Sequence, residues 1–383
     1  NQFRNADGTS PYAAPDYFPF MPIGDPQPIY TGPAYRTLTA KMNGTLDDAA
    51  LYAFDNLKFN EHWSLNGGLR WEHSAASSTV YTVKTFTAPT TANPDPDNTA
   101  IGQISGVQPP AKNANALFSY RLGLVYKPVE NASLYATFSN SKTPSAASVN
   151  GACTATSTTG TANCAAAPQT ALNGEIGMKW DVLAGRLSLT GSIFRNDRTH
   201  YLVTDPGNPD NPSGQQTLDG KARVDGLLLG VAGNLTKHWS VFANYAHLKS
   251  KVLQGASNYS VAQGQDYTRG DPLPSTPADS LSLWTTYDIT RQWQIGYGAI
   301  YVGHYVVSQH SASHPSGPLN TVSPYWLQRA MVRYTLNHNL SFQLNVNNLF
   351  NASYLTNVRT IGDVAWGLPG AARSAVLTAT YMF

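Results

Sequence analysis

Residues 340–354, LSFQLNVNNLFNASY, alternate strictly between apolar and polar side chains. The apolar set is Leu340, Phe342, Leu344 and Val346, and the polar set between them includes Gln343 and Asn345. A period of two residues predicts a β-strand with one apolar and one polar face. A soluble sandwich buries the apolar face of such a strand in a core, whereas an outer-membrane barrel turns that face toward lipid.

The connections between strands distinguish these two classes. Five segments combine a short polar turn with a strand that alternates from its first residue: FNEHWSLNGGLRW, VENASLYATFSNS, LTKHWSVFANYAH, ITRQWQIGYGAIY and LNHNLSFQLNVNN. Long polar segments separate these hairpins, at about 85–114, 142–168, 204–221, 250–275, 305–322 and 351–371. Long loops are uncommon in compact soluble domains, but outer-membrane barrels combine short periplasmic turns with long extracellular loops. The sequence therefore predicts an all-β, transmembrane antiparallel β-barrel.

Three of the short turns are followed by tryptophan. Trp63, Trp239 and Trp293 occupy the same position relative to their turns. The indole ring is amphipathic and suits the headgroup level of a bilayer, so we predict that these residues form an interface girdle. The alternative is that they are ordinary core tryptophans of a soluble fold.

Counting strands backward from Phe383 gives about thirteen, the first two near 46–58 and 62–84. We expect residues 1–45 to be the remnant of an extracellular loop and residues 46–383 to form the C-terminal part of the barrel. Bacterial single-chain barrels have an even number of strands, so an odd number of strands is expected upstream of Asn1.

The amino-acid composition further limits the classes of protein to which the chain can belong. Of the 383 residues, only 13% are charged, and the formal net charge is +2. No dense Lys/Arg run is present, so we predict no binding to nucleic acid. The longest aliphatic run, around 227–229, is far shorter than the ~20 residues that a membrane-spanning helix needs. The chain begins at Asn1 without the basic and apolar regions of a signal peptide, so its start is expected to be a cut.

Candidate catalytic groups are scattered. Ser, His and Asp residues form no nucleophile-elbow motif, so we predict no enzymatic activity. Arg70 with Glu72, and Glu175 with Lys179, are two and four residues apart and share a strand face, which fits a polar barrel lumen better than a catalytic pair. A protease or lipase built on an outer-membrane barrel is the alternative.

Two cysteines and a group of three histidines are candidates for special sites. Cys153 and Cys164 lie in CTATSTTGTANC, for which a loop disulfide is favoured over two free thiols. His304, His310 and His314 match no metal-binding spacing and have no carboxylate between them. We expect exposed loop histidines, no metal site and no cofactor.

Several longer segments resemble a known family. They are ISGVQPPAKN with FSYRLGLVYKPVENASLYATFSNSKTPS (104–145), ALNGEIGMKWDVLAGRLSLTGSIFRNDRTHY (171–201), GDPLPSTPADSLSLWTTY (270–287), VNNLFNASY (346–354) and the terminal TATYMF. Together they resemble the C-terminal barrel of TonB-dependent outer-membrane receptors, and among these the siderophore receptors, most closely the catecholate-type subgroup. The resemblance covers nearly the whole chain.

This resemblance implies a 22-stranded barrel in the outer membrane of a Gram-negative bacterium, filled by an N-terminal plug domain. The plug, the energy-coupling motif and the first strands have no counterpart in this sequence, so a fragment or an incompletely resolved protein is expected. The family imports ferric siderophores with energy from the TonB–ExbB–ExbD complex. The implied partners also include lipopolysaccharide and the barrel-assembly machinery, which would read Tyr381 and Phe383 as the C-terminal assembly signal.

A receptor for an anionic, aromatic iron chelate needs cationic and aromatic side chains near its extracellular loops. The candidate ligand-binding residues are Lys142, Arg198, Tyr201, Tyr267, Arg269, Tyr305, Arg359 and Trp366. A passive porin, or a receptor of the same family for cobalamin or a sugar, remains the alternative function.

Overall fold

A computed structural model describes residues 2–4, 35–38, 40–85, 101–144, 168–204, 216–361 and 364–383. The strands are β1 (Gln2–Arg4), β2 (Tyr35–Thr37), β3 (Lys41–Lys58), β4 (Trp63–Val83), β5 (Ile104–Val107), β6 (Ala111–Val129), β7 (Ala132–Thr143), β8 (Gln169–Val182), β9 (Leu187–Thr204), β10 (Gln216–Asn234), β11 (Trp239–Gln254), β12 (Asp279–Asp288), β13 (Trp293–Val302), β14 (Tyr305–Val306), β15 (Thr321–Val322), β16 (Tyr325–Thr335), β17 (Leu340–Asn347), β18 (Leu355–Ile361), β19 (Val364–Pro369) and β20 (Ser374–Tyr381). The helix α1 (Asn258–Ala262) lies between β11 and β12. No helix within these ranges is both long and apolar enough to cross a membrane.

The chain divides into two compact units. Unit 1 comprises Asn1–Ala49, Glu72–Ala116 and Pro144–Ala167, and unit 2 comprises Ala50–Trp71, Leu117–Thr143 and Pro168–Phe383. Within unit 1, β5 pairs with β4, and β1 pairs with β2. Unit 2 holds nearly all of the remaining strands and every described candidate residue, so the functional argument concerns this unit.

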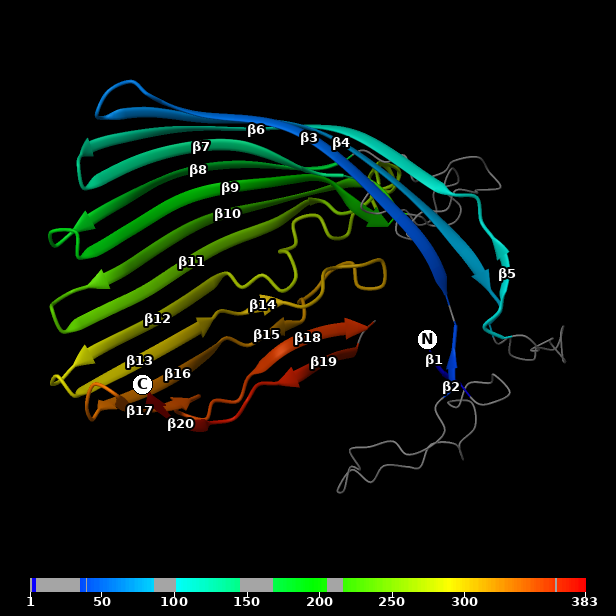
Figure 1. Cartoon of the computed structure of the whole chain (residues 1–383). Helices are drawn as coiled ribbons and strands as arrows, with labels where there is room; N and C mark the ends of the chain where they lie inside the picture. Colours follow the sequence, from blue (N-terminus) through cyan, green and yellow to red (C-terminus); the bar gives the residue numbers. More distant parts are fainter. Residues whose placement is uncertain are drawn as a thin grey trace. The chain divides into compact units, whose positions relative to one another are not determined.

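The main sheet has the order β20-β17-β16-β13-β12-β11-β10-β9-β8-β7-β6-β4-β3, and β5 pairs with β4 off this path (Figure 1). This sheet has 14 strands in the described residues, so removing β5 leaves 13 along the path, as the sequence predicted. Neighbours with a described register are antiparallel, for example β8 with β9 and β12 with β13. The predicted antiparallel strand architecture is therefore confirmed. The first strand of the path begins at Lys41, earlier than the expected start near 46.

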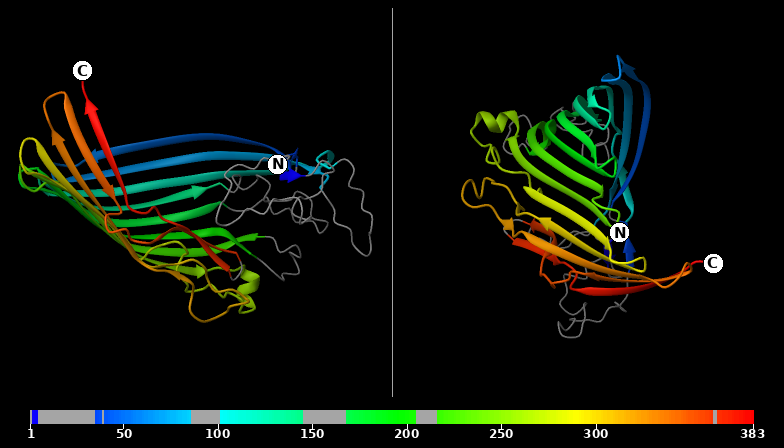
Figure 2. Two further views of the ribbon diagram at one scale, coloured as in Figure 1. Left: turned by 90° about the horizontal axis from the view of Figure 1, so that it is seen from below. Right: turned by 90° about the vertical axis from the view of Figure 1, so that its left-hand side faces the viewer.

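Short turns and long connections occupy opposite ends of the strands of unit 2 (Figures 1 and 2). The predicted alternation is present, but the long connections contain more structure than a polar sequence indicates. The segment between β13 and β16 contains the β14–β15 pair, and the segment between β17 and β20 contains the β18–β19 hairpin. Strands β9 and β10 also extend into the expected loop 204–221, with irregular register between Thr217 and Lys221.

The repeated short turns have a common hydrogen-bond pattern. In the turn before Trp293, the Ile289 N–H donates to the Trp293 carbonyl at 2.9 Å, and the Thr290 hydroxyl accepts from the Trp293 N–H at 3.1 Å. In the turn before Trp63, Asn60 accepts from the Trp63 N–H at 2.8 Å. A short Asn or Thr side chain thus satisfies turn N–H groups that the strands leave unpaired, which explains the recurring sequence pattern.

The register of the strands creates two faces, because directly opposite residues of antiparallel strands project to the same side. One row contains Trp239, Tyr287, Ile295, Val332, Leu344 and Leu377. We call this side the tryptophan face, since Trp239 and Trp293 lie on it and Trp63 stacks on its residue Tyr126 at 4.5 Å. The opposite side, the polar face, includes Glu175, Lys179, Asn244, Ser282, Gln343 and Asn345.

The alternation predicted for 340–347 is found in β17. Leu340, Phe342, Leu344 and Val346 oppose Tyr381, Ala379, Leu377 and Ala375 of β20 on the tryptophan face. The polar face is less uniform in the neighbouring strands, because Phe242 and Trp284 lie on it as an opposed pair.

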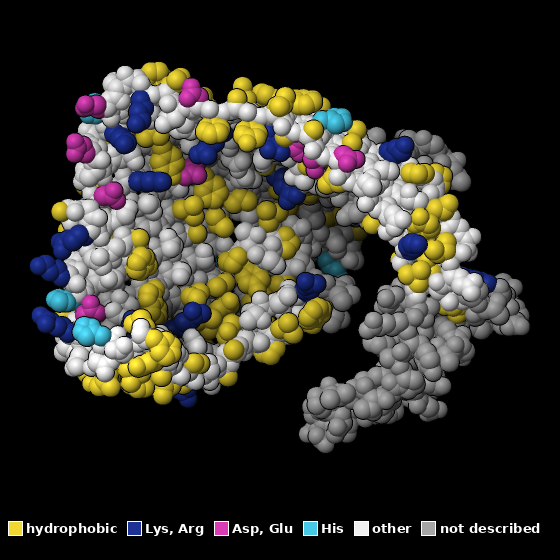
Figure 3. Space-filling view, in the orientation of Figure 1, with side chains coloured by type: hydrophobic (Ala, Val, Ile, Leu, Met, Phe, Trp, Pro, Cys, Tyr) yellow, Lys and Arg dark blue, Asp and Glu magenta, His cyan; other side chains and the backbone are white. Residues whose placement is uncertain are grey.

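The three tryptophans begin β4, β11 and β13, next to the short turns. Trp293 packs against Tyr334 with ring centroids 4.6 Å apart, and the Trp239 indole donates to Thr285 at 2.7 Å. Charged residues and histidines gather along the same edge of the molecule (Figure 3), where the turns contain Glu61, Glu130, Arg186, Lys237 and Arg291. An aromatic belt followed by a charged edge has the order of a bilayer interface, although the girdle itself stays a prediction.

Replacing Leu344 with Arg tests the orientation of the two faces. Leu344 is four residues from the start of β17, ~13 Å along the strand, so it lies near the middle of an apolar band ~25 Å tall. If the tryptophan face contacts lipid, Leu344→Arg should lower the free energy of unfolding by ~2–4 kcal/mol. Denaturant unfolding from phospholipid vesicles measures this. Gln343→Arg, one residue away on the polar face, is the control and should change stability little; equal losses in both variants would contradict the assignment.

Candidate functional site

All eight candidate residues lie at the end of the strands where the long connections are. Lys142 is next to the end of β7, and Arg198 and Tyr201 are near the end of β9. Tyr267 and Arg269 lie between α1 and β12, and Tyr305 lies in β14. Arg359 and Trp366 lie in the hairpin β18–β19.

A bulge in β9 orients Tyr201. His200 has a positive φ of 60°, and the pairing of β9 with β10 shifts there, so that Tyr201 opposes Gly220. A Cβ atom on Gly220 would lie 2.5 Å from the Tyr201 ring, so only glycine leaves room for it. The Tyr201 hydroxyl donates to the Gln254 carbonyl at 3.0 Å. The bulge therefore places Tyr201 on the polar face, where simple alternation would have placed it on the tryptophan face.

Arg198 shares the polar face with Tyr201, since it opposes Ala171 and Ala222. The charges of Arg198 and Asp266 both act on the Tyr201 hydroxyl, so β9 and the segment before β12 meet here. Asp266 accepts from the Gly255 N–H at 3.1 Å, which holds this segment against the end of β11. Tyr267, next to Asp266, is half-buried, and Arg269 is exposed. The structure thus brings Arg198 and Tyr201 together, beside the segment that contains Tyr267 and Arg269.

Lys142 does not belong to this group. It opposes Thr170 of β8, which opposes Thr199 of β9, and this row lies on the tryptophan face. The Lys142 side chain therefore extends from the face of the sheet opposite to the face that carries Arg198.

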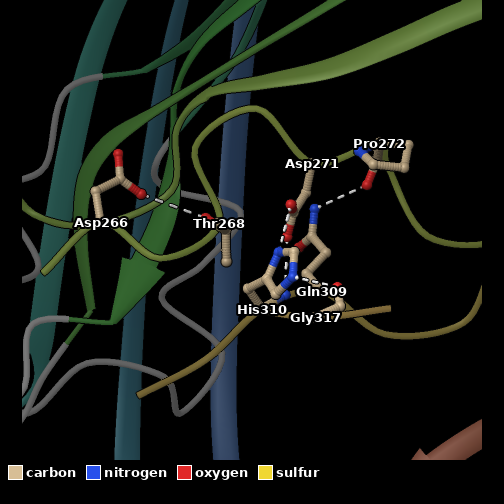
Figure 4. A network of polar contacts seen from close by, with 7 residues as sticks. All are labelled: Asp266, Thr268, Asp271, Pro272, Gln309, His310 and Gly317. Atoms are coloured by element: carbon tan, nitrogen blue, oxygen red, sulfur yellow. Dashed lines mark hydrogen bonds and ion pairs between the residues drawn. The ribbon is translucent and has the colours of Figure 1, made fainter. Parts of the chain in front are cut away.

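The connection before β12 and the connection before β16 are joined by polar contacts, centred on Asp271 and His310, that Figure 4 shows. We call this group of contacts the latch. The carboxylate of Asp271 accepts from the His310 N–H at 2.8 Å and lies 2.7 Å from the His310 ring Nδ1. The Gln309 amide donates to the Pro272 carbonyl at 3.1 Å, and the Ser275 N–H donates to the Val306 carbonyl at 2.9 Å. Asp271 is buried, with 7% of its surface exposed, so the pair anchors both connections.

His310 is not the exposed loop histidine that the sequence suggested. Its second ring nitrogen, Nε2, lies 3.1 Å from the Gly317 carbonyl, so both nitrogens face acceptors and the protonated imidazolium satisfies both. The hydrogen bond to Asp271 raises the pKa of His310 above its usual value, and the Gly317 carbonyl raises that pKa further. His304 and His314 are exposed. Within the described ranges, no three His, Cys, Asp or Glu side chains are grouped to hold a metal ion.

An aromatic group at the same strand ends includes a residue that the sequence did not single out. Tyr325, the first residue of β16, lies on the polar face, and its ring centroid is 5.0 Å from that of Tyr354. Tyr305 is close enough to influence the Tyr325 hydroxyl. Tyr354 is the last residue of the VNNLFNASY motif, so this motif could have pointed to Tyr354 in the sequence.

Arg359 and Trp366 are direct cross-strand partners in the β18–β19 hairpin. Side chains at directly opposed positions project to the same face of a hairpin, so the Arg359 and Trp366 side chains leave the backbone next to each other. Arg359 is exposed, and 42% of the Trp366 surface is exposed. The hairpin therefore presents a cation and an aromatic face together.

Asn348 fixes the base of this hairpin. Its side-chain amide donates to the Ala352 carbonyl at 2.9 Å and the Ala371 carbonyl at 3.0 Å, and its side-chain oxygen accepts from the Ala352 N–H at 2.8 Å. Asn348 is buried and has a φ of 47°, a conformation that asparagine tolerates better than most residues. This is the structural role of the NNLF element.

Cys153 and Cys164 lie outside the described residues, so their disulfide stays a prediction. At the chain end, Tyr381 opposes Leu340 and its ring meets Phe383 edge-on at 5.3 Å, while the assembly role of both residues also stays a prediction.

Comparison with known proteins identifies the class. Residues 2–349 match the family described as "TonB dependent receptor-like, beta-barrel". "Probable TonB-dependent receptor BfrD" of Bordetella pertussis is 37% identical over 338 residues, which cover 87% of this chain and 40% of that protein. The catecholate siderophore receptor Fiu of Escherichia coli K12 is 33% identical over 353 residues, which cover 90% of this chain and 43% of that protein.

A solved structure agrees with these relatives. The closed form of the ferric-catecholate import receptor Fiu superposes with a TM-score of 0.77 at 29% identity, covering 94% of this chain and 48% of that chain. The chain belongs to the TonB-dependent receptor β-barrel family, a family of transport receptors. It spans less than half the length of the relatives named here.

Asn348→Ala tests the clamp, by which we mean the three hydrogen bonds from the Asn348 side chain to Ala352 and Ala371 at the base of the β18–β19 hairpin. The substitution removes three hydrogen bonds worth about 1 kcal/mol each, so the local free energy of opening should fall by roughly 2–4 kcal/mol. Limited proteolysis of residues 352–371 should become faster, which mass spectrometry of the fragments can locate. Asn347→Ala is the matched control, because the neighbouring side chain makes none of these clamp bonds. Unchanged cleavage in Asn348→Ala would contradict the clamp.

The latch should weaken as pH rises. The folded pKa of His310 is raised above its unfolded value of about 6.5, so the stabilisation is complete below about 6.5 and is lost as pH rises through the folded pKa. Proteolytic cleavage of 255–278 and 303–324 should therefore accelerate as the pH rises above about 6.5 and through the raised pKa of His310. In His310→Gln this pH dependence should disappear, whereas His314→Gln should keep it. A parent protein cleaved at a pH-independent rate would show that His310 does not control the connections.

Proposed function

We propose that the protein containing this chain is an outer-membrane receptor of a Gram-negative bacterium that binds and imports a ferric siderophore, with catecholates as the preferred class. The observation that carries the proposal is the 33% identity to the catecholate siderophore receptor Fiu over 90% of this chain.

The side chains at the loop end suit such a ligand. Ferric catecholates are anionic and carry planar, electron-rich rings, which favour guanidinium groups and aromatic faces. Arg359 beside Trp366 supplies both on one hairpin, and Arg198 beside Tyr201 supplies both on the polar face. Tyr325 and Tyr354 add a second aromatic surface near Tyr305.

Import would proceed by capture at these loops, rearrangement of a plug domain and release to the periplasm. In this family the energy comes from TonB with ExbB and ExbD, acting through sequence N-terminal to the barrel. In this mechanism the chain performs no catalytic step and uses no cofactor. The barrel-assembly machinery would act on the C-terminal Tyr381 and Phe383.

A passive porin, a receptor for cobalamin or a sugar, and an outer-membrane enzyme are the other functions considered. No described feature favours any of them over siderophore import. An uptake assay separates the first of these, because import by a receptor stops when TonB is deleted whereas diffusion through a porin continues.

Arg269→Ala and Arg359→Ala test the ligand site. Each variant is made in the protein with the flanking sequence that its gene encodes, and binding is measured for individual purified ferric siderophores. Loss of one charge-assisted contact costs ~1.5–3 kcal/mol, so each variant that removes a contact should bind roughly tenfold to a hundredfold more weakly. Growth of an iron-starved deletion strain that expresses the variants should fall on the same siderophore.

Arg291→Ala, in a short turn at the opposite strand end, is the matched control and should bind like the parent. Assembly of each variant is checked by heat-modifiable gel migration. If the single variants and the double variant all bind every siderophore as the parent does, these arginines are ordinary solvated residues and the proposed site is wrong.

A further inference from the structure

Two arginines on the polar face of β16 have no counter-ion in the described structure. Arg329 opposes Gly298 of β13, and Arg333 opposes Gln294 of β13 and Gln343 of β17. Both arginines are exposed, and neither side chain forms a hydrogen bond or an ion pair with any residue that the structure describes. Their guanidinium groups can therefore bind an anion that comes from outside this sheet.

The sheet around these arginines carries little other charge. Along the described pairing from β11 to β20, the polar face has one further charged residue, Asp288, at the end of β12. Asp288 accepts a hydrogen bond from the Gln294 amide at 2.8 Å and forms no ion pair with Arg333. Because few charges compete with the two guanidinium groups, they create a positive potential along this part of the polar face.

The row that contains the arginines runs from the loop end of β16 to its short-turn end. It begins at Tyr325, whose ring centroid lies 5.0 Å from that of Tyr354 in the aromatic group at the loop end. Arg329 follows four residues later and Arg333 four residues after that, so each step is ~13 Å along the strand. The side chains between them on this face are uncharged. An anion released at the loop end would thus meet one cation at mid-strand and a second near the short turns.

The row ends at a pocket on the short-turn side of the sheet. This pocket has a volume of about 730 Å³, and Arg333, Asp288, Gln294 and Thr335 line it together with residues of the turns that follow β10 and β12. These four residues belong to the polar face, which faces the lumen of the predicted barrel. The arginine and lysine side chains of the pocket outnumber its single carboxylate, Asp288, so the pocket suits an anion.

We propose that Arg329 and Arg333 guide the anionic ferric chelate along β16, from the loop end to this pocket, where the chelate leaves the receptor. This proposal rests on the proposed function and adds a route to it. Passage along a wall requires contacts that attract the ligand and then release it, and two separated arginines meet this condition better than one cluster of cations.

Carboxylates fixed elsewhere in the complete protein are the other anions that these arginines could bind. The position of the row favours a moving chelate, because the row begins at an aromatic group that suits a catecholate and ends at a cationic pocket. A fixed ion pair would need neither of these two features.

The test measures the initial rate of iron-55 uptake by an iron-starved deletion strain that expresses the complete protein. The probes are the purified ferric siderophores of the binding test, with ferric enterobactin as the anionic catecholate. Arg329→Gln and Arg333→Gln should each slow import roughly threefold, and the double variant roughly tenfold. The Kd for capture, measured in a strain without TonB, should keep the parent value. Arg329→Lys preserves the charge and should retain most of the parent rate.

Arg121→Gln is the matched control. Arg121 is also an exposed arginine of the polar face, but it lies on β6, where it opposes Ser139 of β7. This variant should import at the parent rate, and heat-modifiable gel migration checks the assembly of every variant.

Four results would each overturn the route. They are a parent rate in the double variant, equal slowing in Arg121→Gln, equal slowing by Lys and Gln at position 329, and a loss of capture affinity as large as the loss of rate. Parent rates combined with a lower unfolding temperature would assign the arginines to fixed ion pairs. Each of these results leaves import by the parent intact, whereas a parent that imports no ferric siderophore would contradict the proposed function itself.

Discussion

The antiparallel register of neighbouring strands is the constraint on which the rest of this structure depends. Each β-residue alternates between two faces, so a shift of one residue in any strand would move its apolar side chains to the other side. The row from Trp239 through Ile295 and Leu344 to Leu377 shows that the register is kept across six strands. A continuous apolar face exists only because every pair in this row is aligned.

Side chains that bond to the backbone fix this register at both ends of the strands. At the short turns, the side chains of Asn60 and Thr290 accept hydrogen bonds from turn N–H groups. The strand that follows each of these turns therefore begins with a tryptophan on the tryptophan face. At the loop end, Asn348 and the Asp271–His310 pair tie backbone segments that are distant in sequence. The two ends differ because one local side chain can pair with the free backbone N–H groups of a tight turn. The backbone groups of a long connection need hydrogen-bond partners from other connections.

The charged residues follow the same division by face. On the polar face, Arg198 is joined by Tyr201, which reaches that face only through the bulge at His200. On the tryptophan face, Arg195 and Arg223 pair with carboxylates just beyond the apolar residues. Neighbouring charged residues on β9 and β10 are thus directed to opposite faces of the sheet by strand parity.

The sequence alone determined the strand type, the thirteen-strand path, the position of the tryptophans and the family, because each depends on local periodicity or on motifs that stay together in the chain. It did not determine the role of His310, whose partner Asp271 is 39 residues away, or the clamp from Asn348 to Ala371. It also placed Lys142 and Arg198 in one site, although their strands direct them to opposite faces. These features were decided by the tertiary structure, since they depend on which groups of distant loops meet and on the register in which the strands pair, and neither leaves a periodic signal in the sequence.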